Sequence, residues 1–351
     1  MKISRFASSL YSSALFGTPG ASFMSCRAAA AAVVAVLAAA LLAVQAPSLK
    51  VHPVDLSGKM FVVTGCTPGG IGYESAVQLA LWNATVLCSV RNAAKGEAMM
   101  KMVAERLPKT AKGKIEVGYA EFASFKSTRS FAKDVLARLP RIDGILLNAG
   151  LHTAEKIISE DGLDHEIQAN HYSQFLLCRL LEQRLIETGV SRLVFVSSGA
   201  FMMGHLDKTI YNHKARPQGR KGMATYGDSK LFNVLAAMGF AQHFKNLGHP
   251  KIVALSLAPG TVATNFVETS KGEAVLDLAK DWIIPYMPFV RNAAEGAARG
   301  IQALTEPKYA TATGEYLADY IVLSMPASVN AEDVAWLWRE SSLLVGESPE
   351  L

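Results

Sequence analysis

Cysteine is scarce in this chain of 351 residues, and its four cysteines, Cys26, Cys66, Cys88 and Cys178, are scattered along the sequence. No two of them have the close spacing of a zinc site. Nor do they form the dense pattern that stabilises small secreted domains through disulfides. We therefore expect no metal centre and no disulfide framework, which is consistent with a reducing compartment.

The sequence also lacks internal repeats, coiled-coil heptads and any Gly/Ser-rich linker that would divide it. Its net charge of +5 is modest for this length, and no basic helix with interleaved aromatic residues predicts a nucleic-acid partner. About 300 residues follow the N-terminal extension, which suits one large domain. We predict a single domain over residues 51–351, preceded by a separate segment over residues 1–50.

Acidic residues are absent before Asp55, and an unbroken apolar run extends from Ala28 to Val44. This run is at the short end for a membrane span, and its many alanines are only weakly apolar. Three interpretations stay open. The run is a single membrane anchor, in the endoplasmic reticulum or another organelle. Alternatively, the Ser-rich, acid-free start is a plastid or mitochondrial transit segment, or a secretory signal is cleaved near Ala46.

A glycine-rich turn follows the first apolar run of the predicted domain. Residues 60–63 are apolar and β-branched, and residues 64–72 then read Thr-Gly-Cys-Thr-Pro-Gly-Gly-Ile-Gly before a stretch with helical apolar spacing. Glycines let the backbone approach a pyrophosphate, and the free amides of a helix N-terminus favour its charge. The same pattern also occurs in ordinary strand–helix connections, so by itself it only suggests a dinucleotide site.

The end of the second predicted strand bears on the choice of cofactor. Residues 84–90 read as a strand that ends at Arg91-Asn92, and no carboxylate follows before Glu97. An NAD site places an acidic residue about 20 residues past the glycines, whereas an arginine accommodates the 2′-phosphate of NADP. We therefore expect NADP(H).

Tyr226 and Lys230 are four residues apart, about one helical turn, so both side chains project from the same face of a helix. A phenol normally titrates near pH 10 and is a poor base at neutral pH. An ammonium one turn away stabilises the phenolate and lowers its pKa. The pair therefore predicts a tyrosine that acts as acid and base.

Apolar runs that read as strands alternate with helical stretches along the whole domain, which is the signature of a parallel α/β sheet. The predicted strands cover residues 60–64, 84–90, 115–119, 143–147, 191–197, 251–257 and 315–320.

With these residues in place, the chain resembles the short-chain dehydrogenase/reductase family over residues 55–345. The resemblance is strongest to the branch with retinol dehydrogenases, the WW-domain oxidoreductase and light-dependent protochlorophyllide reductase. It implies α/β architecture, with a single Rossmann-type doubly wound parallel sheet and helices on both faces. The further motifs that carry it are Asn148-Ala149-Gly150, Gln168-Ala169-Asn170-His171, Ser197-Ser198 and Pro259-Gly260.

The resemblance implies a catalytic set in which Tyr226 exchanges the proton, Ser198 polarises the carbonyl and Asn170 supports a water relay to Lys230. No metal ligands belong to this set. The cofactor-binding residues that we expect are Gly65, Thr67, Gly70, Ile71, Gly72, Arg91, Asn92, Glu121, Phe122, Asn148, Ala149, Gly150, Tyr226, Lys230, Pro259, Gly260, Thr261, Val262 and Thr264.

Three features depart from the family pattern. The glycine motif carries one extra residue, which we expect Pro68-Gly69 to absorb. Glu121-Phe122 stands where the family has Asp-Leu beside the adenine. The segment between Ser198 and Tyr226 is long, which predicts an elaborated cover over the substrate.

We predict an NADP(H)-dependent oxidoreductase that interconverts a carbonyl and an alcohol on a small lipophilic substrate, such as a retinoid, steroid or lipid. The alternatives are a non-catalytic nucleotide-binding subunit of a larger assembly and a protochlorophyllide-type reductase in a plastid. A single-span membrane attachment and a homodimer both stay open. Flexible and aromatic side chains expected near the substrate, or else in the core, are Phe201, Met202, Met203, Met223, Phe266, Trp282, Tyr286 and Met287.

Overall fold

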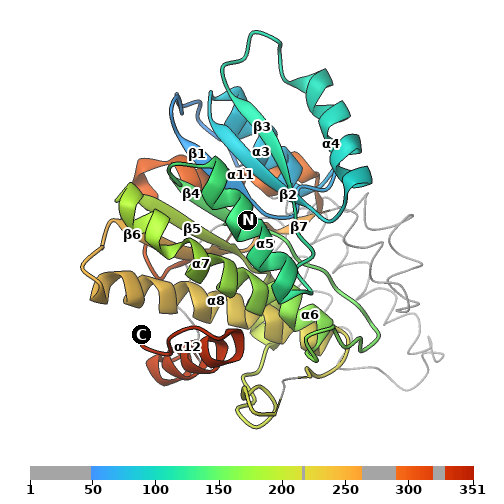
Figure 1. Ribbon diagram of the computed structural model, residues 1–351, viewed down its shortest axis with the longest axis vertical. Coiled ribbons are helices and arrows are strands. Elements are labelled where there is room, and N and C mark those ends of the chain that lie inside the picture. The colour runs from blue at the N-terminus through green and yellow to red at the C-terminus, as the bar shows by residue number, and fades with distance from the viewer. Residues whose placement is uncertain (1–48, 216–217, 263–289, 319–328) are drawn as a thin grey trace, which may run out of the picture. The chain divides into compact units, whose positions relative to one another are not determined.

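The computed structural model describes residues 49–215, 218–262, 290–318 and 329–351. These residues form a seven-stranded sheet in the order β3-β2-β1-β4-β5-β6-β9, and every neighbouring pair is parallel (Figure 1). The strands of this sheet are β1 (Met60–Val63), β2 (Thr85–Val90), β3 (Lys114–Tyr119), β4 (Gly144–Leu147), β5 (Ser191–Val196), β6 (Ile252–Leu257) and β9 (Tyr316–Leu317). The seven predicted strands are thus found within a few residues of their expected bounds.

Helices connect these strands. They are α3 (Ile71–Leu81), α4 (Ala93–Arg106), α5 (Phe125–Arg138), α6 (His165–Ile167), the π-helix η1 (Gln168–Tyr172), α7 (Ser173–Thr188), the 3-10 helix η2 (Gly199–Met203), α8 (Met223–Asn246), α11 (Ala293–Thr305), the 3-10 helix η4 (Pro307–Tyr309) and α12 (Ala331–Val345). Two short strands, β7 (Thr261–Val262) and β8 (Val290–Arg291), pair in parallel outside the main sheet.

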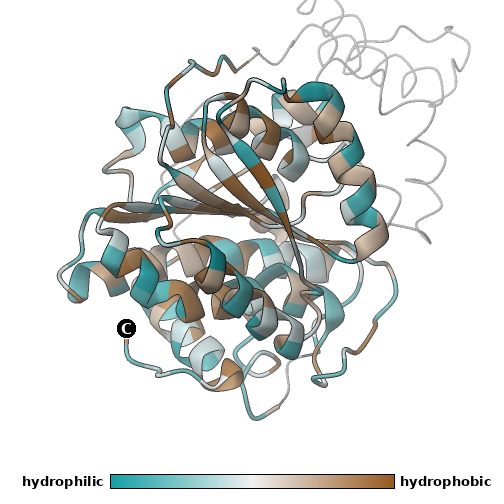
Figure 2. Cartoon of the chain, turned by 45° about the horizontal axis from the view of Figure 1, so that its top comes forward, coloured by the Kyte–Doolittle hydropathy of each residue, from teal (hydrophilic) through white to brown (hydrophobic). Residues whose placement is uncertain are grey.

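Both faces of the sheet are covered, which confirms the predicted doubly wound fold. Figure 2 shows the sheet running between two layers of helices. Side chains of one strand alternate between the layers. In β1, Val62 belongs to the core under α5, α7 and α8, whereas Phe61 and Val63 belong to the core under α3 and α11. Because both faces are buried, the strands read as continuous apolar runs.

The strand order reverses between β1 and β4. The chain proceeds from β1 outward through β2 to β3, and it then returns to place β4 on the other side of β1. In open parallel sheets, ligands bind beside the carboxyl ends of the strands at such a reversal. The glycine-rich turn after β1 and the Asn-Ala-Gly turn after β4 both lie at this position.

The C-terminal helix α12 packs against α8 and α7. Its Trp338 is buried and lies against Phe175 and Phe240, with ring centroids 5.1 and 4.9 Å away. A Cβ on Gly239 of α8 would lie 2.9 Å from the Trp338 ring, so glycine makes the notch that the indole fills.

Among the helices that the structure describes, none combines the length and the apolar character that a membrane span requires. The predicted N-terminal run from Ala28 to Val44 lies outside the described residues.

Candidate active site

The glycine-rich turn brings the backbone of β1 close to that of β4. Gly65 has φ +73°, and a Cβ there would lie 2.8 Å from the Cα of Ala149. A Cβ on Gly72 would lie 2.6 Å from the carbonyl oxygen of Gly65. Side chains at either position would push the turn apart. Gly70 is the N-cap of α3 and has no side chain to occupy the first-turn amides, so an anion fits at this helix end.

The extra residue of this turn is expected at Pro68-Gly69. Gly69 has φ +72°, and a Cβ there would meet no atom within 4 Å. Gly69 therefore lies in open space, unlike the close contacts at Gly65 and Gly72.

Asn148 ties the ends of β1 and β4 together. Its Nδ2 donates to the carbonyl oxygens of Thr64 at 3.0 Å and Gly65 at 3.2 Å. The Thr64 hydroxyl oxygen accepts from the amides of Asn148 and Ala149, each at 2.9 Å. These bonds hold the two turns at a fixed separation, which suits a rigid dinucleotide site.

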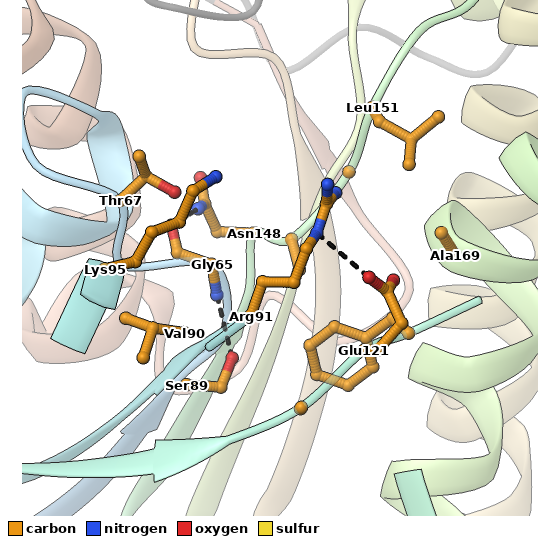
Figure 3. A pocket seen from close by; sticks show the side chains of 14 residues that line it. Gly65, Thr67, Ser89, Val90, Arg91, Lys95, Glu121, Asn148, Leu151 and Ala169 are labelled. Carbon is orange, nitrogen blue, oxygen red and sulfur yellow. Dashed lines mark hydrogen bonds and ion pairs between the residues drawn. The ribbon is translucent and has the colours of Figure 1, made fainter. Parts of the chain in front are cut away.

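A pocket opens beside these turns, and it contains charged groups from three segments (Figure 3). Arg91 Nε lies 3.0 Å from Glu121 Oε2, so the cation expected to bind a phosphate is already paired with the predicted adenine contact. The residues that line the pocket are Gly65, Thr67, Ser89, Val90, Arg91, Lys95, Ala120, Glu121, Phe122, Asn148, Ala149, Gly150, Leu151 and Ala169.

Lys95 is a second cation of this pocket that sequence reasoning missed. Figure 3 shows it extending toward the glycine-rich turn. Asn92, expected to bind the cofactor, is the N-cap of α4, and its Oδ1 accepts from the amide of Lys95 at 3.0 Å. Asn92 does not line the pocket and acts by setting the start of the helix that carries Lys95. The signal available in the sequence was the position of Lys95, one turn after Arg91.

Tyr226 and Lys230 share one face of α8, as their spacing predicts. The Nζ of Lys230 lies 5.4 Å from the centroid of the Tyr226 ring and donates to the carbonyl oxygen of Val196 at 3.1 Å. Ser198 follows β5, and its side chain hydrogen-bonds with that of Tyr226. The ends of β5 and the first turns of α8 thus bring these three side chains together.

Asn170 lies in the π-helix η1, a type of turn that is frequent at functional sites. Its Oδ1 accepts from the amide of Leu151 at 2.8 Å, and its Nδ2 donates to the Ser229 hydroxyl at 3.0 Å. A Cβ on Gly150 would lie 3.1 Å from Asn170 Oδ1 and 3.3 Å from Lys230 Nζ. Asn170 and Lys230 therefore flank Gly150, where the absence of a side chain leaves room between them.

The protonation of the pair differs from the expectation that Lys230 brings the pKa of Tyr226 down. Burial raises the pKa of Tyr226 above its usual value, the negative charge of Glu166 adds to this rise, and the bond with Ser198 only partly opposes it. Burial also lowers the pKa of Lys230 to about 8. The helical spacing predicted the proximity of the two groups, but the depth at which α8 is buried determines their charge.

Sequence reasoning also missed a buried pair behind Tyr226. The His152 ring centroid is 5.4 Å from that of Tyr226, and His152 Nδ1 is 3.3 Å from both carboxylate oxygens of Glu166. Each residue is 1% exposed. The available signals were positional, since His152 comes two residues after the Asn-Ala-Gly turn and Glu166 about one turn before Asn170.

The predicted residues after β6 are described in part. The Pro259 carbonyl oxygen accepts from Arg291 at 3.2 Å, Gly260 has φ +82°, and Val262 in β7 lies against Gly296 of α11. Thr261 belongs to the same short strand. Thr264 lies outside the described residues.

Of the side chains expected near the substrate, Phe201 belongs to the core, because it is buried with its ring centroid 4.7 Å from that of Tyr316. Met202 is 71% exposed and Met203 is also exposed, both within η2 directly after Ser198. Met223 is half-buried at the start of α8. The remaining four lie outside the described residues, namely Phe266, Trp282, Tyr286 and Met287.

Known proteins are similar to this chain in sequence and in fold. A family model described as short chain dehydrogenase matches residues 59–213. Retinol dehydrogenase 11 of Homo sapiens is 30% identical over 294 residues, which cover 84% of this chain and 87% of that protein. The WW domain-containing oxidoreductase of Drosophila melanogaster is 26% identical over 309 residues, which cover 85% and 71%. A short-chain dehydrogenase/reductase structure from Serratia marcescens superposes with a TM-score of 0.56 at 23% identity, covering 76% and 97%.

Proposed function

The chain belongs to the short-chain dehydrogenase/reductase family, in the branch that includes retinol dehydrogenases, and on that premise we propose that it is an NADP(H)-dependent enzyme interconverting a carbonyl and an alcohol. The family consists of oxidoreductases that use nicotinamide nucleotides and act on small molecules. The observation that carries the proposal is the meeting of Tyr226, Ser198 and Lys230 at the end of β5, with Asn170 across Gly150.

A nicotinamide dinucleotide suits the contacts of the pocket. The approach of Gly72 to Gly65 leaves no Cβ in the way of a pyrophosphate, and the N-terminus of α3 favours its charge. Two cations, Arg91 and Lys95, line the pocket against one carboxylate, Glu121. This positive balance supports NADP(H) over NAD(H), because a 2′-phosphate gains charge-assisted hydrogen bonds there. When bound, the nicotinamide supplies or accepts the hydride.

The chain's own groups handle the proton. A carbonyl oxygen placed between the hydroxyls of Ser198 and Tyr226 accepts from both, which polarises the carbonyl carbon toward hydride attack. The raised pKa of Tyr226 keeps its hydroxyl protonated at neutral pH, so it is ready to donate in the reductive direction. Lys230, with a pKa of about 8, is mainly an ammonium at pH 7 and stabilises the phenolate that this donation leaves.

The substrate is proposed to be a lipophilic alcohol or ketone. Two arguments support this class. The relatives include a retinol dehydrogenase. In addition, Met202 and Met203 present flexible apolar side chains directly after Ser198. Such side chains adapt to apolar ligands of irregular shape.

Replacing Tyr226 with Phe tests the proposal. The variant keeps the ring against His152 and loses only the hydroxyl, so we expect turnover of NADPH with a lipophilic aldehyde or ketone panel to fall by about 10²–10⁴-fold. NADPH affinity should stay within about twofold, because the pocket beside the glycine-rich turn, with Arg91 and Lys95, is not lined by Tyr226. Tyr119→Phe, at an exposed tyrosine, is the matched control. Turnover of Tyr226→Phe close to wild type would remove Tyr226 from the chemistry.

Replacing Arg91 with Ala tests the cofactor choice. Losing a charge-assisted contact to the 2′-phosphate costs roughly 1.5–3 kcal/mol, so the Kd of NADPH should rise by about 10–100-fold while that of NADH changes little. Lys101→Ala, on the exposed side of α4, removes the same charge away from the pocket and is the control. Titration of cofactor fluorescence measures both affinities. Equal weakening of the two cofactors would show that Arg91 only supports the pocket through Glu121.

A further inference from the structure

A buried carboxylate lies close to the proposed reaction centre and has no part in the chemistry described above. Glu166 belongs to α6, and its two carboxylate oxygens each lie 3.3 Å from His152 Nδ1. Oε2 also accepts from the amide of Thr153 at 3.0 Å. His152 in turn lies against the Tyr226 ring at 5.4 Å between centroids. The order of contact is therefore Glu166, His152, Tyr226.

The backbone holds both members of this pair in place. His152 lies two residues after Gly150, in a loop that Asn170 fixes through both the amide and the carbonyl of Leu151 at 2.8 and 2.9 Å. Glu166 is held by the N-cap of α6, where Asp164 accepts from the Glu166 amide at 3.0 Å. Since both ends are anchored, the His152 ring has little freedom to turn away from Tyr226.

Glu166 influences both groups of the proposed acid–base pair. Its negative charge raises the pKa of Tyr226 and also that of Lys230. A carboxylate removed from water normally costs several kcal/mol unless it is paired, and Glu166 has such partners in His152 and the Thr153 amide.

The other polar groups around this cluster are uncharged or bond to other residues. Ser198, at the start of η2, is uncharged and bonds to Tyr226. Asp164 caps α6, with Lys156 of the preceding loop acting on its charge. Asn170 bonds to Leu151 and Ser229. Glu166 is thus the carboxylate that acts on both Tyr226 and Lys230 among the residues described around them.

We propose that Glu166 and His152 act as one unit of positioning residues, which orients the Tyr226 ring and fixes the pH range over which its proton is transferred. The proposal rests on the proposed function, because it concerns the same tyrosine. Glu166 orients the imidazole through Nδ1, and its charge keeps Tyr226 protonated and Lys230 cationic to higher pH.

Glu166→Gln is the direct test, since it keeps an acceptor for the Thr153 amide and removes the charge. The pH profile of kcat/KM is measured with NADPH and a ketone, and with NADP⁺ and the alcohol. We expect the midpoint of both profiles to follow the deprotonation of Lys230, whose pKa is about 8, and to move about one unit to lower pH when the charge of Glu166 is removed. NADPH affinity should stay within about twofold. Glu155→Gln, an exposed residue of the same loop, should leave both profiles unchanged.

A double variant tests whether the two residues form one unit. His152→Phe keeps a ring against Tyr226 and removes the bond to Glu166. The double variant, which combines His152→Phe with Glu166→Gln, should have the pH profile of Glu166→Gln alone. A double variant whose shift is the sum of the shifts of the two single variants would show that the two residues act independently. A wild-type chain without turnover would contradict the proposed function itself. An active wild type whose Glu166→Gln variant loses thermal stability but keeps its pH profile would reduce the pair to a structural contact.

Discussion

Asp164 shows how a single buried side chain can serve the fold at one pH and oppose it at another. It is the N-cap of α6, where its Oδ1 accepts from the amides of Glu166 and Ile167, each at 3.0 Å. Its other oxygen lies close to Gly219, because a Cβ there would be 2.7 Å from Oδ2. Burial raises the pKa of Asp164 from 3.8 to about 6 in spite of these bonds. At neutral pH the protein therefore contains a poorly solvated carboxylate.

This predicts a pH-dependent stability that Asp164→Asn removes. Because the folded-state pKa lies above the unfolded value, the stability that comes from protonated Asp164 is complete below about pH 4 and is lost as the pH rises through about 6. Asparagine keeps the cap oxygen and carries no charge. The free energy of unfolding of the variant at pH 8 should exceed that of wild type by about 1–3 kcal/mol.

Urea unfolding at pH 4 and pH 8 measures the effect. The difference between Asp164→Asn and wild type should be small at pH 4 and should grow toward pH 8. A difference of the same size at both values would show that the cap geometry, and not the charge, accounts for it.

At the scale of elements, the long connection between Ser198 and Tyr226 is fastened to the helix that carries the tyrosine. Asp228, fully buried on α8, accepts from the amide of His205 at 2.7 Å, the hydroxyl of Tyr211 at 2.7 Å and Nε of Arg220 at 2.8 Å. The Asp228 carboxylate is therefore hydrogen-bonded to three residues of the described connection. The expectation that this segment is an elaborated cover remains a proposal, and Asp228 is the residue that would hold such a cover in place.

The C-terminal helix α12 holds the same connection from another direction. Glu340 accepts from the amide of His213 at 3.0 Å, and Lys208 pairs with Asp333 at 3.0 Å. Hydrogen bonds and ion pairs therefore fasten the connection between Ser198 and Tyr226 to both α8 and α12.

Removing Asp228 should weaken this network strongly. Asp228→Ala leaves the buried Tyr211 hydroxyl and the Arg220 guanidinium without their acceptor, so we expect a loss of about 3–5 kcal/mol in unfolding free energy. Asp228→Asn keeps one acceptor oxygen, enough for either the His205 amide or the Tyr211 hydroxyl, and should lose less. In the active fraction, KM for the substrate should rise while NADPH affinity stays within about twofold.

Glu332→Ala is the matched control for this prediction. It removes a carboxylate with an 85% exposed side chain that pairs with Lys208 at 2.9 Å, and such surface pairs contribute less than about 1 kcal/mol. Denaturant unfolding and steady-state kinetics on the three variants give the comparison. Equal stability of Asp228→Ala and Glu332→Ala would mean that the connection folds independently of α8.

At the scale of the whole molecule, every described residue of the proposed site follows Lys59, and residues 1–48 lie outside the described structure. We propose that residues 51–351 form the enzyme domain and that the run from Ala28 to Val44 attaches it to a membrane. At the N-terminal end of the described residues, the carbonyl oxygen of Lys50 accepts from Gln302 Nε2 of α11 at 2.7 Å.

The membrane proposal predicts the behaviour of two proteins. The full-length chain should stay in the membrane fraction after an alkaline carbonate wash, and a chain that begins at Val51 should be extracted and should keep turnover within about twofold. Leu37→Arg places a charge inside the run and should reduce membrane retention, since a central arginine costs about 2.5–3.5 kcal/mol on insertion.

N-terminal sequencing of protein from its native source tests the alternative that the run is removed. A mature chain that starts after Val44 and washes off freely would mean that the run is a cleaved signal.

The sequence by itself determined the order of strands and helices, because each depends on neighbours along the chain. Apolar runs predicted the strands, glycines marked the turn after β1, and a four-residue spacing put Tyr226 and Lys230 on one helix face. Burial and partners from distant segments were decided only by the tertiary structure. The pairing of Arg91 with Glu121 joins the ends of two strands, and the contact of His152 with Glu166 joins a loop to a helix. The pKa of Tyr226 depends on how much water and charge the folded chain leaves around it, a property that no local spacing contains.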